Sequence, residues 1–164
     1  MIDERFHTEK LVVVGPGMLG TSVALGLRAR GFAGRLVALG RRQATLDEAA
    51  RTGAYDTLTD DPALALADAS LALVAVPLGG FRAVYRQIAE HAPRELVVTD
   101  VGSTKASVIA DARAELPDLS RVIGAHPMAG SEKAGPAAAD PDLFVGKPCV
   151  LTLSDGDDSA SVAL

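Results

Sequence analysis

Short apolar runs alternate with segments of helical periodicity along most of this chain. The first run, Leu11 to Val14, is followed by Leu19, Val23 and Leu27, whose four-residue spacing predicts a helix that ends near Gly31. Strands alternating with helices at short spacing indicate βαβ units. The sequence therefore predicts an α/β, Rossmann-type doubly wound domain, with a mainly parallel sheet and helices on both faces. Further strands are expected over 35–39, 71–76, 95–101, from 122 onward and over 148–153, and further helices over 45–52, 62–69, 81–91, 106–116 and 159–164.

Some of these helices carry local signals at their ends. Asp61 precedes Pro62, and its carboxylate can accept hydrogen bonds from the N–H groups of the first turn. We therefore expect Asp61 to be the N-cap of the helix over 62–69. Gly53 and Pro93 are expected to end the helices that precede them.

A Gly-x-Gly-x-x-Gly turn joins the first predicted strand to the first predicted helix. The first glycine would permit the tight turn, the second would let the backbone approach a pyrophosphate, and the third would let the helix pack closely on the strand. Pro16 has no N–H, so the phosphate contacts would come from later residues. In the alternative interpretation, these glycines only shape a strand–helix turn. We predict a dinucleotide site with the contacts Gly15, Gly17, Met18, Leu19 and Gly20.

The end of the second predicted strand indicates which dinucleotide binds. In this architecture an acid at that position hydrogen-bonds the ribose hydroxyls of NAD, whereas an arginine accommodates the 2′-phosphate of NADP. The position is Gly40, 20 residues after Gly20, and Arg41 and Arg42 follow it. Because arginine can bind phosphate bidentately, we predict that Gly40, Arg41 and Arg42 favour NADP, with NAD as the alternative cofactor. In the competing interpretation, two surface arginines only solubilise a turn.

Two polar clusters follow consecutive apolar runs in the second half of the chain. They span 100–105 (DVGSTK) and 124–135 (GAHPMAGSEKAG). Taken alone, Ser103 fits a helix N-cap, His126 fits a satisfied core histidine, and the charges of the second cluster fit solvated side chains. Because parallel strands end at one edge of a sheet, both clusters are expected beside the nicotinamide, which favours a substrate site.

Composition excludes several classes of function. The net charge is −5 with no basic stripe, which argues against a nucleic-acid partner. The apolar runs are too short to span a bilayer and residues 1–10 lack the apolar core of a signal peptide, so we expect no membrane association and a cytoplasmic location. Cys149 is the only cysteine, which fits a reducing compartment. Its apolar neighbours favour a small core residue over a catalytic thiol. No metal site is predicted.

Four motifs occur in the order seen in prephenate and arogenate dehydrogenases. They are Gly15 to Gly20, Val76 to Gly79, Asp100 to Lys105, and Gly124 to Glu132, of which the histidine-centred block is the most specific. Across about residues 8–153 the chain resembles the nucleotide-binding domain of that family. The resemblance implies an oxidoreductase of tyrosine biosynthesis, in which hydride passes to the nicotinamide while prephenate or arogenate loses CO2 and becomes aromatic.

The same resemblance implies roles for individual residues. His126 would accept the proton of the substrate hydroxyl, and Ser103 would orient that hydroxyl and the histidine. Glu132 matches a family acid near the substrate pocket, with a purely structural contact as the alternative. The implied substrate-binding residues are Ser103, His126, Ser131, Glu132 and Lys133, and the further cofactor contacts are Val76, Pro77, Leu78, Asp100 and Gly102.

The expected domain organisation follows from the resemblance. Residues 1–153 would form the NADP-binding domain, with 1–9 as a polar arm, and 154–164 would form a linker and the start of a truncated helical domain. In the family this helical second domain builds a homodimer and supplies cations for the substrate carboxylates, whereas the cations expected near the site here are Lys105 and Lys133. We therefore expect the chain to bind cofactor and to turn over poorly, and, because it exposes apolar surface, either to self-associate or to be only modestly stable.

Two other functions stay open. Another NADP-dependent oxidoreductase, of the β-hydroxyacid dehydrogenase type, would share the glycine turn, but such families usually place their catalytic lysine in the following helical domain. A non-catalytic NADP-binding module would keep the glycine turn and Arg41 but would have no use for Ser103 and His126.

Overall fold

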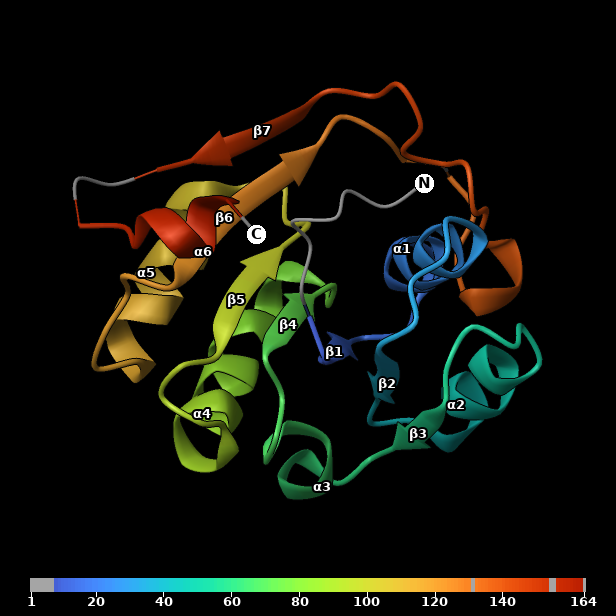
Figure 1. Cartoon of the computed structure of the whole chain (residues 1–164), viewed down its shortest axis with the longest axis horizontal. Helices are drawn as coiled ribbons and strands as arrows, with labels where there is room; N and C mark the ends of the chain where they lie inside the picture. Colours follow the sequence, from blue (N-terminus) through green and yellow to red (C-terminus); the bar gives the residue numbers. More distant parts are fainter. Residues whose placement is uncertain (1–7, 131, 154–155, 164) are drawn as a thin grey trace.

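A twisted seven-stranded sheet runs through the residues that the computed structural model describes, 8–130, 132–153 and 156–163 (Figure 1). Its spatial order is β3-β2-β1-β4-β5-β6-β7. The first six strands are parallel, and the last pairs antiparallel with β6. The predicted α/β fold with a mainly parallel sheet is therefore confirmed. The strands are β1 (Lys10–Val14), β2 (Arg35–Leu39), β3 (Thr57–Thr59), β4 (Leu71–Val74), β5 (Val97–Asp100), β6 (Val122–Pro127) and β7 (Cys149–Thr152).

Helices cover both faces of the sheet. Side chains alternate between the faces along each strand, so two hydrophobic clusters form. On one face Val13 packs in a cluster with Ala24 of the first helix, and on the other Val12 lies in a cluster with Phe81 and Val108 from the fourth and fifth helices. The helices are α1 (Met18–Ala29), α2 (Gln43–Ala50), α3 (Pro62–Leu66), α4 (Phe81–His91), α5 (Lys105–Glu115) and α6 (Ser159–Ala163), with short 3-10 helices η1 (Leu78–Gly80) and η2 (Pro136–Ala138).

The third helix begins as the sequence predicts. Oδ1 of Asp61 accepts the N–H of Ala63 at 2.9 Å and that of Leu64 at 3.4 Å, and Pro62 occupies the first turn. The predicted N-cap is confirmed. The helix is shorter than the predicted 62–69, because the chain turns after α3 to enter β4.

The edge strands differ from the prediction. β3 is not predicted from the sequence, because its three residues, Thr57–Thr59, include only one apolar side chain. The strand predicted over 148–153 is present as β7, and its pairing of Cys149 with Pro127 makes it antiparallel. Cys149 is exposed on this edge strand, so the expectation of a buried core cysteine is wrong.

The chain ends are described only in part. The described residues begin at Thr8, so most of the predicted polar arm lies outside them. The helix predicted over 159–164 is observed as α6, and the N–H of Asp158 fixes its start by donating to Ser120 O at 2.7 Å. None of the described helices has the length and apolar content needed to cross a membrane.

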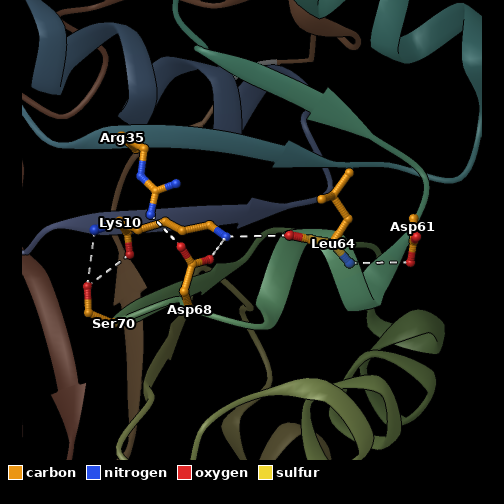
Figure 2. A network of polar contacts seen from close by, with 6 residues as sticks. All are labelled: Lys10, Arg35, Asp61, Leu64, Asp68 and Ser70. Atoms are coloured by element: carbon orange, nitrogen blue, oxygen red, sulfur yellow. Dashed lines mark hydrogen bonds and ion pairs between the residues drawn. The ribbon is translucent and has the colours of Figure 1, made fainter.

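An ion-pair network at the amino edge of the sheet buries a lysine of β1 (Figure 2). Lys10 is 3% exposed, and its ammonium donates to the carboxylate of Asp68 and to Leu64 O. Arg35, the first residue of β2, donates to the same carboxylate. Hydrogen bonds from Lys10 and Arg35 lower the pKa of Asp68 to about 2. A buried charge is tolerated only when paired, so this amino-edge network (Lys10, Arg35 and Asp68) explains how a lysine can begin a buried strand.

Candidate active site

The predicted site residues leave the sheet at its carboxyl edge. Because β1 to β6 are parallel, the segments that follow these strands start from the same edge. β2 and β4 flank β1, so the order of the strands reverses between β1 and β4. Open α/β sheets bind ligands outside the strand ends at such a switch point. The fold therefore brings the candidate cofactor and substrate residues to the edge where ligands bind.

The turn after β1 has no room for side chains at two of its glycines. Gly15 has a φ of +90°, and a Cβ there would lie 2.8 Å from Ala75 O. A Cβ at Gly20 would lie 2.7 Å from Val13 Cγ1. At Gly17, by contrast, a Cβ would meet nothing within 4 Å. The base of the turn is closely packed, and its tip borders open space.

The first helix starts at that open tip. Its first backbone hydrogen bond runs from the N–H of Thr21 to Gly17 O at 2.9 Å, so the N–H groups of Met18, Leu19 and Gly20 have no acceptor within the helix. No side chain caps this end. These three donors and the helix dipole suit an anion, and the space at Gly17 admits one. The local structure therefore fits the pyrophosphate of a dinucleotide.

The glycine at the end of β2, where the acid of an NAD site is expected, is closely packed. A Cβ at Gly40 would lie 2.9 Å from Leu46 Cδ2 and 3.2 Å from Pro16 Cδ, so the glycine packs against both α2 and the glycine turn. Arg41 and Arg42 follow it and are exposed. Neither guanidinium has a partner among the described residues. Two unpaired cations therefore stand where this fold places the adenosine ribose.

The end of β4 forms the other side of the switch point. Val76 lies against the glycine turn, because a Cβ at Gly15 would approach Val76 Cγ1 to 2.8 Å. Pro77 and Leu78 are exposed, and Leu78 begins η1. Val76, one of the three predicted cofactor contacts of this segment, thus lies against the turn that would hold the pyrophosphate.

The turn after β5 is built around Asp100, which is 1% exposed. Its Oδ1 accepts the N–H of Gly102 at 2.6 Å and the ammonium of Lys105, and its Oδ2 accepts the N–H of Ala125 at 3.4 Å. Lys105, expected near the substrate as a cation, has its charge balanced by Asp100. This ion pair is not among the sequence-based predictions, although both residues lie in one predicted motif.

The charge of Asp100 also reaches the fourth helix. Burial, and secondarily the negative charges of Asp100 and Asp111, raise the pKa of Tyr85. The Tyr85 hydroxyl is buried with no hydrogen-bond partner in the described part of the chain. This side chain therefore stays neutral at physiological pH and serves packing between α4 and α5.

Ser103 and His126 lie at the carboxyl ends of two neighbouring strands. β5 and β6 pair in a register that matches Thr99 with Ile123, Ser103 lies in the turn after β5, and His126 lies near the end of β6. Ser103 is exposed and His126 is half-buried. Neither side chain has a hydrogen-bond partner within the described ranges. Both are therefore available to a ligand at the carboxyl edge.

The other predicted substrate residues follow β6. Glu132 and Lys133 are exposed, and Ser131 lies outside the described residues. Their roles in substrate binding stay predictions. Within the described residues, no group of three or more His, Cys, Asp or Glu side chains could hold a metal ion.

The segment after β6 crosses to the opposite half of the sheet (Figure 1). We call residues 135–142 the strap. Within it, η2 contacts both α1 and α2. The N–H of Asp140 donates to Ser22 Oγ at 3.0 Å, and Asp142 pairs with Arg30 at 2.8 Å. The strap therefore links the strand that carries His126 to the helix that would bind phosphate. No sequence pattern predicts this connection.

Comparison with known proteins gives the family. The family described as prephenate dehydrogenase, nucleotide-binding domain, matches residues 23–164. Prephenate dehydrogenase of Bacillus subtilis is 30% identical over 155 residues, which cover 94% of this chain and 42% of that protein.

Solved structures share the fold as well. Prephenate dehydrogenase from A. aeolicus, in complex with hydroxyphenyl propionate and NAD+, has a TM-score of 0.88 and 26% identity, over 96% of this chain and 55% of that one. Synechocystis arogenate dehydrogenase has a TM-score of 0.83 and 31% identity, over 94% of this chain and 53% of that one. The chain thus spans about half the length of these relatives. It belongs to the prephenate dehydrogenase family, as a nucleotide-binding domain.

Proposed function

We propose that this chain is the cofactor-binding domain of an NADP-preferring prephenate or arogenate dehydrogenase. The observation that carries the proposal is that Ser103, in the turn after β5, and His126, near the end of the neighbouring β6, lie at the edge where the glycine turn also opens. The A. aeolicus relative holds NAD+ together with hydroxyphenyl propionate. Such a pair of ligands supports a site for a dinucleotide beside a ring-bearing acid.

The chemistry needs few groups from the protein. When bound, the nicotinamide supplies the hydride acceptor. Oxidation of the ring hydroxyl also releases a proton, and the imidazole of His126 accepts it, since imidazole is the general base suited to neutral pH. The Ser103 hydroxyl hydrogen-bonds the substrate hydroxyl and orients it toward the histidine. Loss of CO2 makes the ring aromatic, so the residues of this site orient the substrate and accept one proton.

The substrate carboxylates need cations, but the two lysines expected near the substrate already have partners. Prephenate carries two carboxylates, and charge-assisted hydrogen bonds from cations are the usual way to bind them. Lys105 is held by Asp100, and Lys133 also interacts within the domain. We therefore assign recognition of the substrate carboxylates, and the contacts of a homodimer, to the remainder of the full-length protein.

Arg41 and Arg42 support the preference for NADP. We expect this chain to bind NADPH more tightly than NADH, and Arg41→Ala to weaken NADPH about tenfold through loss of a charge-assisted hydrogen bond while leaving NADH within about twofold. Titrations followed by nicotinamide fluorescence measure both affinities. Arg51→Ala, an exposed arginine at the C-cap of α2, is the matched control and should change neither. Tighter binding of NADH than of NADPH by the wild type would contradict the preference for NADP but not the family assignment.

The catalytic roles are tested in the full-length protein. His126→Asn should lower kcat on the order of 10²- to 10⁴-fold, because the general base is lost, and should leave the Kd for NADPH unchanged. His91→Asn, at the end of α4, is the control and should keep wild-type turnover. Near-normal kcat in His126→Asn would refute the assignment of the base. The wild type could bind NADPH but fail to reduce NADP+ with either prephenate or arogenate. That result would favour a β-hydroxyacid dehydrogenase or a non-catalytic module.

A further inference from the structure

One buried carboxylate contacts the backbone next to each candidate catalytic residue. Oδ1 of Asp100 accepts the N–H of Gly102 at 2.6 Å, and Gly102 directly precedes Ser103. Oδ2 accepts the N–H of Ala125 at 3.4 Å, and Ala125 directly precedes His126. The same side chain therefore joins the turn after β5 to the end of β6.

A lysine makes this arrangement stable. The side chain of Asp100 is 2% exposed and that of Lys105 is 14% exposed, and the ammonium donates to Oδ1. An ionised carboxylate buried without a cation would strongly destabilise the fold. Because Lys105 is the first residue of α5, the ion pair also fixes that helix to the turn that carries Ser103.

Two glycines give the pair its space. A Cβ at Gly102 would lie 2.9 Å from Asp100 Oδ1. A Cβ at Gly124 would lie 3.2 Å from Lys105 Cδ and 3.8 Å from Asp100 Oδ2. The backbone of β6 therefore packs directly against the ion pair, two residues before His126.

We propose that Asp100, neutralised by Lys105, is the positioning residue that holds Ser103 and His126 in one geometry. The inference rests on the proposed function, because it concerns the same reaction. It gives Asp100 a role different from the cofactor contact that the sequence suggests. Asp100 is only 1% exposed, so its carboxylate does not reach the substrate directly. It acts through the two backbone segments that it joins, the turn after β5 and the end of β6.

The first test is Asp100→Asn in the full-length protein. The amide keeps an acceptor for Gly102 but turns an NH2 group toward the N–H of Ala125, so the contact to β6 is lost. Misplacement of reacting groups by about 1 Å lowers rates on the order of 100-fold. We expect kcat to fall on the order of 10- to 100-fold while the Kd for NADPH stays within about twofold. A wild-type kcat would overturn the proposal.

A double variant separates positioning from stability. Asp100→Asn leaves a buried ammonium without its partner, and Lys105→Met leaves a buried carboxylate, so each single change destabilises the fold. Asp100→Asn together with Lys105→Met removes both charges, and we expect the Tm to recover while kcat stays low, because Ala125 still lacks its acceptor. If kcat recovers together with the Tm, the role of the pair is structural and the proposal is wrong.

The amino-edge network supplies the matched control (Figure 2). Asp68→Asn also removes a carboxylate from a buried lysine, but at the opposite edge of the sheet. It should lower the Tm and leave kcat within about twofold, because Asp68 shares no partner with Asp100, Ser103 or His126. A loss of kcat equal to that of Asp100→Asn would show that any weakened ion pair slows the reaction, and would overturn the inference.

Amide hydrogen exchange on this chain tests the geometry without any activity. In Asp100→Asn, and in the double variant, the N–H of Ala125 should exchange faster while that of Gly102 keeps its protection. Unchanged exchange at Ala125 would overturn the positioning role. If the wild-type full-length protein turns over neither prephenate nor arogenate, the proposed function fails, and the exchange result still decides whether Asp100 joins the two segments.

Discussion

At the level of single residues, the amino-edge network shows how one charge is kept inside the sheet (Figure 2). The ammonium of Lys10 is almost fully buried, whereas the side chain of Asp68 is 55% exposed. The carboxylate therefore meets both water and the protein, and it also accepts a hydrogen bond from Arg35. The network anchors the first residues of β1 and β2 to the segment after α3.

We expect acid to weaken this network over a defined range. The pKa of Asp68 falls from its ordinary value of 3.8 to about 2 because Lys10 and Arg35 donate hydrogen bonds to it. Since the folded-state pKa is the lower one, the stabilisation is complete above about pH 4 and is lost as the pH falls toward 2. The unfolding free energies of wild type and Asp68→Asn should differ by about 1 kcal/mol at pH 7, allowing for the exposed carboxylate, and should converge near pH 2. Urea unfolding at several pH values measures the difference, and a constant difference would contradict the prediction.

Local steric roles can be read from sequence, but long-range partners cannot. Gly15 is predictable because its turn needs a positive φ, and Gly20 because a Cβ there would meet Gly15 O of the same turn and Val13 of the preceding strand. The burial of Lys10 is not, because its partner lies 58 positions away. The pair of Asp100 and Lys105 falls between these cases. The motif that contains both residues can be recognised in the sequence. The inward direction of their side chains, however, depends on Gly124 of β6, which packs against them.

At the level of elements, the backbone of the strap packs directly against α1. A Cβ at Gly26, in the middle of that helix, would lie 2.9 Å from Pro141 O. The carbonyl of Pro141 also accepts a hydrogen bond from Arg30 at 3.1 Å. The helix and the strap therefore approach as closely as a glycine allows.

Gly26→Ala tests this packing. Alanine inside a helix is usually more stable than glycine by about 1 kcal/mol. Here we expect a net loss of about 1–2 kcal/mol, because the new methyl group must displace the backbone of the strap. Gly79→Ala is the control, since a Cβ there would meet nothing within 4 Å. Urea unfolding compares the two variants, and a net gain in Gly26→Ala would mean that the strap moves away easily.

The direction of β7 is also an element-scale property. The apolar run over 148–153 predicts a strand but carries no signal for its orientation. The orientation follows from the path of the preceding segment, which leaves β6 at the carboxyl edge, passes through the strap, and re-enters the sheet at that same edge. Contacts between the strap and α1 decide this path, and they join distant parts of the sequence.

At the level of the whole molecule, β7 forms an apolar edge. In the part of the chain that the structure describes, its outer side pairs with no strand, and Val150 and Leu151 are 50% and 45% exposed. Edge strands of this kind are templates for association between chains. The expected self-association of this chain would start here.

Leu151→Lys tests that expectation. A charge on the edge strand should lower the associated fraction of this chain, because lysine disfavours pairing between edges. Leu64→Lys is the matched control, since Leu64 is 61% exposed on α3 and lies outside the edge. Sedimentation velocity over a range of concentrations measures the distribution. A monomeric wild type, or equal effects of both changes, would contradict the edge as the origin of association.

The strap also has a consequence for the time course of biosynthesis. Its contacts with α1 join positions 118 and 112 residues apart, those of Ser22 with Asp140 and of Arg30 with Asp142. A ribosome adds about 5–20 residues per second, so α1 emerges on the order of 10 s before the segment that covers it. During that interval the nascent chain can already form the glycine turn while one face of its helix has no cover. A segment that is synthesised more than 100 residues after α1 therefore completes the surroundings of that helix.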